Sequence, residues 1–196
     1  PRSTLFPYTT LFRSSYLFFF VSGFLAYKAS QVWNIQNLGS LLLKKFKVQV
    51  IPTVVFFFLA MAILNKDFWP AVEKAYHSVF KGGYWFTIVL LYMFILYYLF
   101  CYLESKLKVK SWIPITVLFI ISMCFYDTFY QPRYFSWALG YRRAATPLKQ
   151  FLDDTSLLNL MLYFPFFLYG NIVHRYWDKS QKVMDSKWFY PLIIAL

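Results

Sequence analysis

The stretch that decides the fold reads FFFVSGFLAY at Phe18 to Tyr27 and, after a polar segment, LLLKKFKVQVIP at Leu41 to Pro52. The first part is apolar and aromatic, and the second carries a lysine cluster just before another apolar run. This order is typical of a membrane crossing, a basic connector that lies on the membrane surface, and a return crossing. We therefore expect a polytopic membrane protein organised around these residues.

The composition of the whole chain favours the same class. Of its 196 residues, 60% are hydrophobic, 24% are aromatic and only 14% are charged, whereas soluble domains carry about 25% charged residues. Twenty Lys and Arg against eight Asp and Glu give a net charge of +12. Because these basic residues lie between apolar runs, we expect them to set the topology and to contact anionic lipids. Nucleic-acid binding is not expected.

Apolar windows of about the length that a helix needs to cross a bilayer predict the spans. The windows are 14–27, 48–65, 82–103, 111–126 and 155–173, and a sixth begins at Trp188. Pro52 lies near the start of its window, where a helix tolerates proline, and Pro165 predicts a kink. The predicted fold is an all-α polytopic transmembrane helical bundle of about five to six spans, incomplete at both ends.

The connectors between these windows predict an orientation. Those at 28–47, 104–110 and 174–187 hold eleven Lys and Arg, and those at 66–81 and 127–154 hold seven. The positive-inside rule therefore places the first set in the cytoplasm. A reporter fused after Lys108 that was active only outside the cell would contradict this orientation.

The first 14 residues are not expected to be native protein. Thr4 to Ser14 reads TLFPYTTLFRS, and all eleven residues match the in-frame translation of a common sequencing-library adapter. We therefore divide the chain into an adapter-derived segment, 1–14, and a partial membrane domain, 15–196. The alternative is a genuine N-terminal pair of strands, indicated by the repeated TLF.

Four stretches follow one another along the domain. They are FFFVSGFLAY from Phe18, KKFK followed by Ile51 and Pro52, GGYWF at 82–86, and YFPFFLYGN at 163–171. Together they resemble the acyltransferase-3 family of integral-membrane O-acyltransferases. The resemblance implies a fragment of an enzyme of the bacterial cytoplasmic (inner) membrane. Such an enzyme transfers an acyl group, commonly acetyl, from cytoplasmic acyl-CoA to a hydroxyl of a cell-envelope or surface glycan.

The resemblance also implies residues near the acyl donor, namely Ser22, Gly23, Lys44, Lys45, Lys47 and Trp85. The Ser-Gly pair would line the acyl path, and the lysines would bind the phosphates of CoA. Each has an alternative role: the small pair permits close helix packing, the lysines anchor the chain at the membrane surface, and the tryptophan joins an aromatic belt.

The longest polar connector supplies the candidates for binding the acceptor, which are Arg133, Trp137, Arg142 and Arg143. Aromatic and charged side chains suit stacking on sugars and hydrogen bonding to their hydroxyls. The alternative is an amphipathic segment that lies on the lipid headgroups.

The four motif stretches assign no catalytic residue within the chain. The family's catalytic His is implied on a helix upstream of Ser15, where the adapter-like segment stands. We therefore expect this polypeptide to be inactive and the Ser22–Gly23 face to lack its partner helix. His77 and His174 are expected to be solvated or interfacial.

Other polar residues have structural roles in this interpretation. Asn159 and Asn171 are expected to form hydrogen bonds between helices. Cys101 and Cys124 lie inside apolar runs, which predicts buried thiols and neither a disulfide framework nor a zinc site. No bound cofactor or metal is predicted, and acyl-CoA enters as a substrate.

Two other classes of function remain open. A polytopic transporter or flippase for an envelope precursor would also use proline-broken helices and aromatic loops. The nearly charge-free spans argue against an ion-coupled carrier. A membrane scaffold without chemistry is the third alternative.

Overall fold

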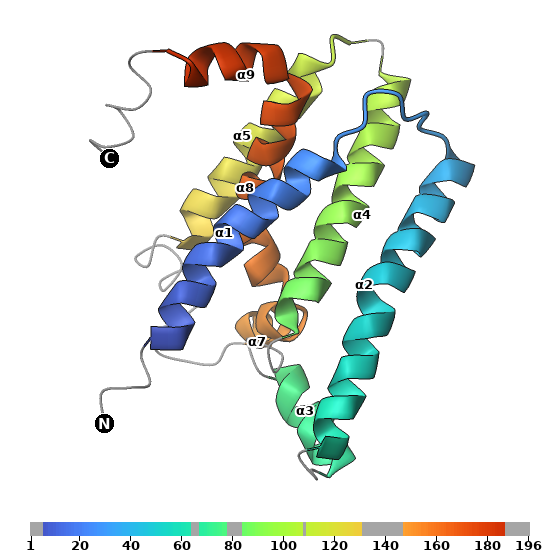
Figure 1. Cartoon of the computed structure of the whole chain (residues 1–196), viewed down its shortest axis with the longest axis vertical. Helices are drawn as coiled ribbons and strands as arrows, with labels where there is room; N and C mark the ends of the chain where they lie inside the picture. Colours follow the sequence, from blue (N-terminus) through green and yellow to red (C-terminus); the bar gives the residue numbers. More distant parts are fainter. Residues whose placement is uncertain (1–5, 64–66, 78–83, 108, 131–146, 187–196) are drawn as a thin grey trace. The chain divides into compact units, whose positions relative to one another are not determined.

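The computed structural model describes residues 6–63, 67–77, 84–107, 109–130 and 147–186, and within these ranges the chain forms helices and no strand (Figure 1). The helices are α1 (Phe6–Ala26), α2 (Ile35–Ile63), α3 (Phe68–His77), α4 (Trp85–Lys106), α5 (Trp112–Tyr130), α7 (Pro147–Asp154), α8 (Leu157–Arg175) and α9 (Trp177–Met184). The predicted all-α class is confirmed for these residues. Helix α1 begins inside the adapter-like segment.

Three of the described helices, α2, α4 and α8, are long and apolar enough to cross a membrane. Two further windows correspond to shorter apolar helices, Ser15–Ala26 within α1 and Trp112–Phe125 within α5. The sixth predicted window, from Trp188, lies outside the described residues. Length and composition therefore support three membrane spans.

The chain divides into two compact units. One comprises Pro1–Gln31 and Phe166–Leu196, and the other comprises Val32–Pro165. The boundary falls inside α8 at Pro165. Proline has no backbone N–H and its ring crowds the carbonyl four residues earlier, so a helix bends most readily there. The proline that predicts a kink therefore marks the division between the units.

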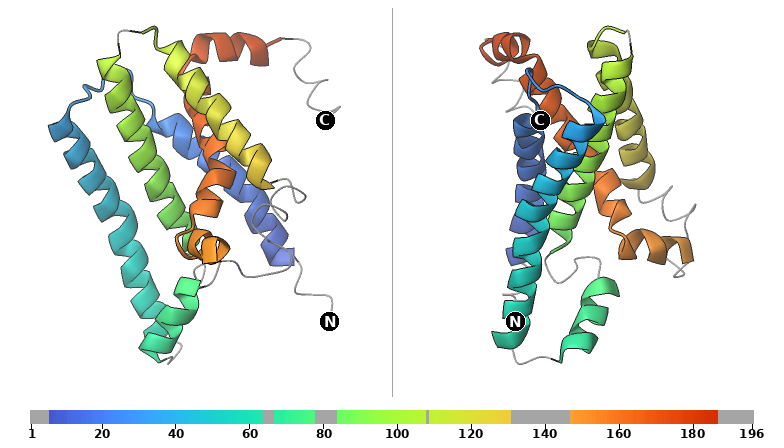
Figure 2. Two further views of the ribbon diagram at one scale, coloured as in Figure 1. Left: turned by 180° about the vertical axis from the view of Figure 1, so that it is seen from behind. Right: turned by 90° about the vertical axis from the view of Figure 1, so that its right-hand side faces the viewer.

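Helices α2 and α4 lie side by side in the second unit and run antiparallel (Figure 1; Figure 2). Just before α2, the ring of Trp33 lies 5.4 Å from the ring of Tyr98, near the end of α4. Towards the end of α2, the ring of Phe57 lies 5.5 Å from the ring of Tyr84, which precedes α4. These two aromatic contacts fix the register of the pair.

The core of this unit lies on α4. Its buried residues recur every three to four positions, as one face of a helix requires. They are Trp85, Val89, Leu90, Met93, Phe94, Tyr97, Tyr98 and Cys101. In the apolar window of α2, by contrast, only 6% of the residues are buried inside the protein, against 39% in α4. An apolar helix with so little protein cover is suited to hydrocarbon, which supports contact with a lipid bilayer.

The lysine cluster lies on a helix, so the sequence-based prediction of a basic loop between two crossings is wrong. Helix α2 begins at Ile35 and runs through the cluster to Ile63. Its start is explained by Asn34, whose side-chain oxygen accepts a hydrogen bond of 2.8 Å from the backbone N–H of Asn37. This cap begins the helix ahead of the lysines.

Pro52 lies in the interior of α2, not near the start of a helix as predicted. It removes the N–H that would bond to the carbonyl of Val48. In the same turn, the hydroxyl of Thr53 donates a hydrogen bond of 2.7 Å to the carbonyl of Gln49. The helix thus continues through the proline with a side-chain hydrogen bond beside it.

Helix α5 has little buried surface along its apolar length. Ile115 and Ser122 are its buried residues among those whose exposure is described, and Cys124 is exposed. The predicted burial of both thiols is therefore correct for Cys101 and wrong for Cys124. The sequence of an apolar helix does not distinguish the side that faces protein from the side that faces lipid, because both sides are apolar.

Candidate functional site

Helices α1 and α8 approach each other closely within the first unit. Gly23 is buried, and a Cβ built on it would overlap the backbone carbonyl of Phe167. The relation is mutual, since a Cβ on Gly170 would overlap the backbone carbonyl of Phe20. Only glycine allows two helical backbones to come this near. The two glycines therefore define the crossing of α1 and α8.

Two polar side chains of α8 bond to backbone carbonyls of α1 at this crossing. The side-chain nitrogen of Asn171, a fully buried residue, donates to the carbonyl of Gly23 at 3.4 Å. One turn later, Nδ1 of His174 bonds to the carbonyl of Phe24. A carbonyl oxygen only accepts, so Nδ1 carries the proton and Nε2 is the remaining nitrogen. The predicted hydrogen bond between helices by Asn171 is confirmed.

Aromatic rings enclose the imidazole of His174. It stacks on Phe24 with ring centroids 4.2 Å apart and an angle of 11°, and Tyr27 lies against it edge-on at 5.3 Å. The guanidinium of Arg175 lies over the ring of Tyr27 at 5.3 Å. His174 is thus half-buried among these rings, and its interfacial position stays a prediction. Its partners on α1 cover the ring, and the local sequence around His174 did not reveal them.

The crossing supports the packing role predicted for Gly23, and the donor-lining role of Ser22 and Gly23 stays a prediction. Gly23 serves close helix packing, and Ser22 is half-buried beside it. The expectation that this face lacks a partner helix is wrong, because α8 covers Gly23. The sequence did not predict this partner since the contact joins residues 148 positions apart.

The three lysines of α2 have different surroundings. Lys44 and Lys47 are exposed, whereas Lys45 is half-buried and its Nζ lies 3.7 Å from the centroid of the Phe94 ring on α4. Lys45 therefore makes a cation–π contact between α2 and α4. Lys44 and Lys47, three residues apart, share a face of the helix and remain accessible to an anion.

Trp85 belongs to the protein core. It is 9% exposed, at the first position of α4, and its ring lies 5.4 Å from that of Tyr163 on the first part of α8. The sequence predicts either a donor-binding role or a position in an aromatic belt for this residue. Burial against Tyr163 favours packing.

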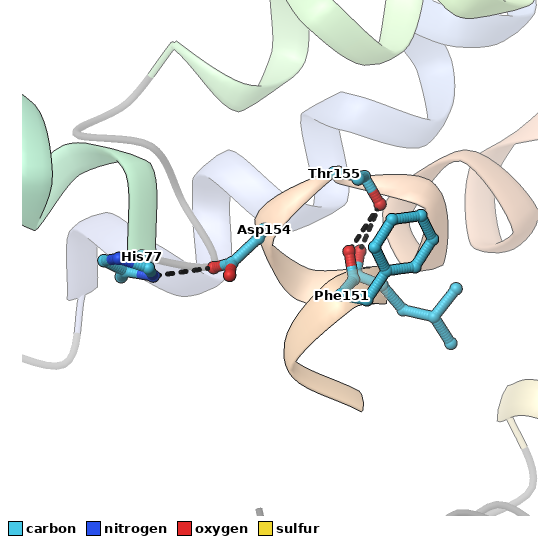
Figure 3. Close-up of polar contacts among 5 residues, drawn as sticks. His77, Phe151, Asp154 and Thr155 are labelled. Carbon is cyan, nitrogen blue, oxygen red and sulfur yellow. Dashed lines mark hydrogen bonds and ion pairs between the residues drawn. The ribbon is translucent and has the colours of Figure 1, made fainter. Parts of the chain in front are cut away.

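A second cluster brings two distant connectors together, since α3 packs against α7. Nδ1 of His77 lies 3.2 Å from Oδ1 of Asp154 (Figure 3). The aspartate side chain is 13% exposed and the histidine side chain 49% exposed. The two connectors that were predicted to share one side of the membrane therefore meet. His77 is exposed as expected, but it is also held by a carboxylate that the sequence did not identify.

A tight turn fixes the position of Asp154 at the end of α7. The hydroxyl of Thr155 donates a 2.6 Å hydrogen bond to the carbonyl of Phe151 (Figure 3). Ser156 then adopts a left-handed conformation with φ 58°, which non-glycine residues rarely adopt. Its carbonyl accepts a hydrogen bond of 3.1 Å from the N–H of Leu160 in α8. The turn separates the two helices immediately after the aspartate.

The predicted acceptor residues Arg133, Trp137, Arg142 and Arg143 lie outside the described residues. Within the ranges that the structure covers, no group of three or more His, Cys, Asp or Glu side chains could hold a metal ion.

Comparison with known proteins adds no relative, since no family model, no curated protein and no solved structure matches the chain. The class of protein therefore follows from the helical architecture alone. The described residues form a helical protein with three helices fit to span a membrane. Within it are a glycine-mediated helix crossing and a separate histidine–aspartate pair.

Proposed function

We propose that the chain is part of an integral-membrane O-acyltransferase of the bacterial cytoplasmic membrane. It would transfer an acyl group, such as acetyl, from acyl-CoA to a hydroxyl of a cell-envelope or surface glycan. The observation that carries the proposal is the packing of two motif stretches, FFFVSGFLAY and YFPFFLYGN, against each other. Gly23, Gly170 and Asn171 make these contacts. Motifs that serve one site must meet in space, and these two do.

The donor side of the proposal rests on Lys44 and Lys47. Their ammonium groups are exposed on one face of α2, where they are free to approach the phosphates of acyl-CoA. Lysine binds phosphate as a point charge and not through a bidentate fork, so orientation must come from other contacts. Lys45 is not part of this set because it packs on Phe94.

The double variant Lys44→Gln/Lys47→Gln should weaken acetyl-CoA binding. Exposed ion pairs contribute up to about 1 kcal/mol each, so we expect the Kd to rise roughly tenfold. The remaining affinity should depend less on salt. Isothermal titration of the chain in detergent micelles measures both effects.

The matched control is Lys179→Gln/Lys182→Gln. These lysines are also exposed and three residues apart, on α9, so the variant makes the same change in charge. Equal weakening by both pairs would mean that only the overall charge matters and that α2 holds no donor site.

The function itself is tested by deleting the gene that encodes this chain and analysing the surface polysaccharide. We expect O-acyl groups to be lost while the polysaccharide is exported normally. Unchanged acylation with accumulation of an intracellular precursor would overturn the proposal and support a transporter or flippase.

A further inference from the structure

We infer that α9 is a membrane-surface helix that binds the phosphate of an anionic phospholipid, together with the adjoining ends of α1 and α8. These parts belong to one compact unit, 1–31 and 166–196. Helix α8, which is long and apolar enough to cross a membrane, ends at Arg175, and α9 begins at Trp177. The inference does not depend on acyl transfer, and it assigns lipid contact to one defined place among the basic residues of the chain.

The chain turns sharply between α8 and α9. Tyr176 has φ −118° and ψ 40°, outside the helical region, and therefore interrupts the helix. Its carbonyl accepts hydrogen bonds of 3.0 Å from the N–H of Lys179 and 2.9 Å from the N–H of Ser180, which start α9. Helix α9 thus runs across the end of α8 and does not continue it (Figure 1; Figure 2). A helix across the end of a membrane span lies along the membrane surface.

An aromatic contact holds the start of α9. The ring of Trp177 meets the ring of Phe24 on α1 edge-on at 5.6 Å, and Phe24 also stacks on His174. Trp177 is nevertheless 42% exposed. A tryptophan that packs on protein and remains open on another side suits the membrane interface, where its ring meets hydrocarbon and its N–H meets headgroups. This contact fixes the start of α9 at the level where the span ends.

The two faces of α9 differ in character. Trp177 and Met184 are seven positions apart and share one face of the helix, whereas Lys179 and Lys182 lie on the opposite face. A helix of eight residues is marginal by itself in water. An interface that takes up the apolar face and leaves the lysines at the headgroups stabilises such a helix.

Basic side chains gather at this corner of the unit. The guanidinium of Arg175 lies over the ring of Tyr27 at 5.3 Å, and the exposed Lys28 follows Tyr27 directly. Lys179 and Lys182 are also exposed. In the part of the chain that the structure describes, none of these three lysines forms an ion pair with a carboxylate. Their ammonium groups are therefore accessible to a phosphate.

The two acidic residues of this segment have structural positions. Asp178 lies in the first turn of α9, where a carboxylate stabilises the positive end of the helix dipole, and Asp185 is the residue that ends the helix. The basic residues of the corner outnumber them. Charge complementarity therefore favours an anionic headgroup over a zwitterionic one, by about fivefold for each lysine near the membrane surface.

The test titrates the full chain in detergent micelles with phosphatidylglycerol or phosphatidylcholine, and native mass spectrometry measures each Kd. The unaltered protein should bind phosphatidylglycerol more tightly. In Lys179→Gln/Lys182→Gln the Kd for phosphatidylglycerol should rise about 20-fold, while the Kd for phosphatidylcholine should not change. An unaltered preference for phosphatidylglycerol in this variant would overturn the inference.

Lys106→Gln/Lys110→Gln is the control, since it removes the same charge from exposed lysines at the end of α4 and just after it. Equal weakening by both variants would mean that total charge sets the preference and that α9 holds no lipid site. Added acetyl-CoA separates the two sources of phosphate. It should leave phosphatidylglycerol bound, and displacement of the lipid would assign the α9 lysines to a soluble ligand and overturn the lipid site.

The position of α9 is tested separately with a nitroxide label in phosphatidylglycerol vesicles. Val183 is 60% exposed, so Val183→Cys can carry the label. Cys124→Ser removes the other exposed thiol, and Cys101 is buried. At the headgroups, the label should collide with both oxygen and a water-soluble nickel chelate. Collisions with the chelate alone would place α9 in water and contradict a membrane-surface helix.

Discussion

Replacing Gly23 by valine should separate α1 from α8. The first added carbon already overlaps the backbone carbonyl of Phe167, and a backbone cannot move aside as a flexible side chain can. Overpacking of a fitted interface costs about 1–3 kcal/mol and sometimes more, and here the value should reach the upper part of that range. The shift would also lengthen the hydrogen bond from Asn171 to the carbonyl of Gly23.

Hydrogen exchange of the chain in detergent micelles measures this effect locally. Amides of α1 and of the last part of α8 should exchange faster, while those of α2 and α4 should keep their protection. Gly39→Val is the matched control. Gly39 is also helical, on α2, but a Cβ there meets nothing within 4 Å, so we expect a change within about 0.5 kcal/mol. Similar protection in the Gly23 and Gly39 variants would contradict the crossing.

Sequence reasoning identified Gly23 as a candidate for close packing but predicted that its face would lack a partner helix. The Ser22–Gly23 pair shows that some backbone approaches closely, because small residues in apolar helices permit this. Nothing in the local pattern shows which backbone it is. Periodicity reports the face of a helix, whereas the pairing of Gly23 with Phe167 depends on how distant helices pack.

For the lysine cluster, by contrast, the sequence does contain a signal that predicts a helix. Asn34 is a preferred helix-capping residue, and it precedes the cluster by ten positions. Weighing this signal against the charge of the segment would have extended the helix back to Ile35. For His77 and Asp154 no such signal exists, since an isolated histidine and an isolated aspartate look solvated until packing joins them.

Replacing Trp85 by alanine should destabilise the second unit strongly. The ring is 9% exposed and packs on Tyr163 at 5.4 Å, so its removal leaves a cavity between α4 and α8. Truncation of a buried tryptophan costs about 3–5 kcal/mol. Trp85→Phe keeps an aromatic ring at this contact and should cost less, about 1–2 kcal/mol. Thermal or denaturant unfolding in detergent micelles provides the comparison.

Trp112→Ala is the matched control, because Trp112 and Trp85 have the same position in the sequence pattern. Each is the first residue of an apolar helix, and each would suit an interfacial belt. In the structure Trp112 is 54% exposed, so its truncation should change the unfolding free energy by no more than about 0.5 kcal/mol. If Trp85→Ala were equally mild but abolished acetyl-CoA binding, the residue would be a donor contact and not a core residue. The difference in unfolding free energy between the two variants thus measures the burial of Trp85. A pattern of apolar windows does not predict this burial.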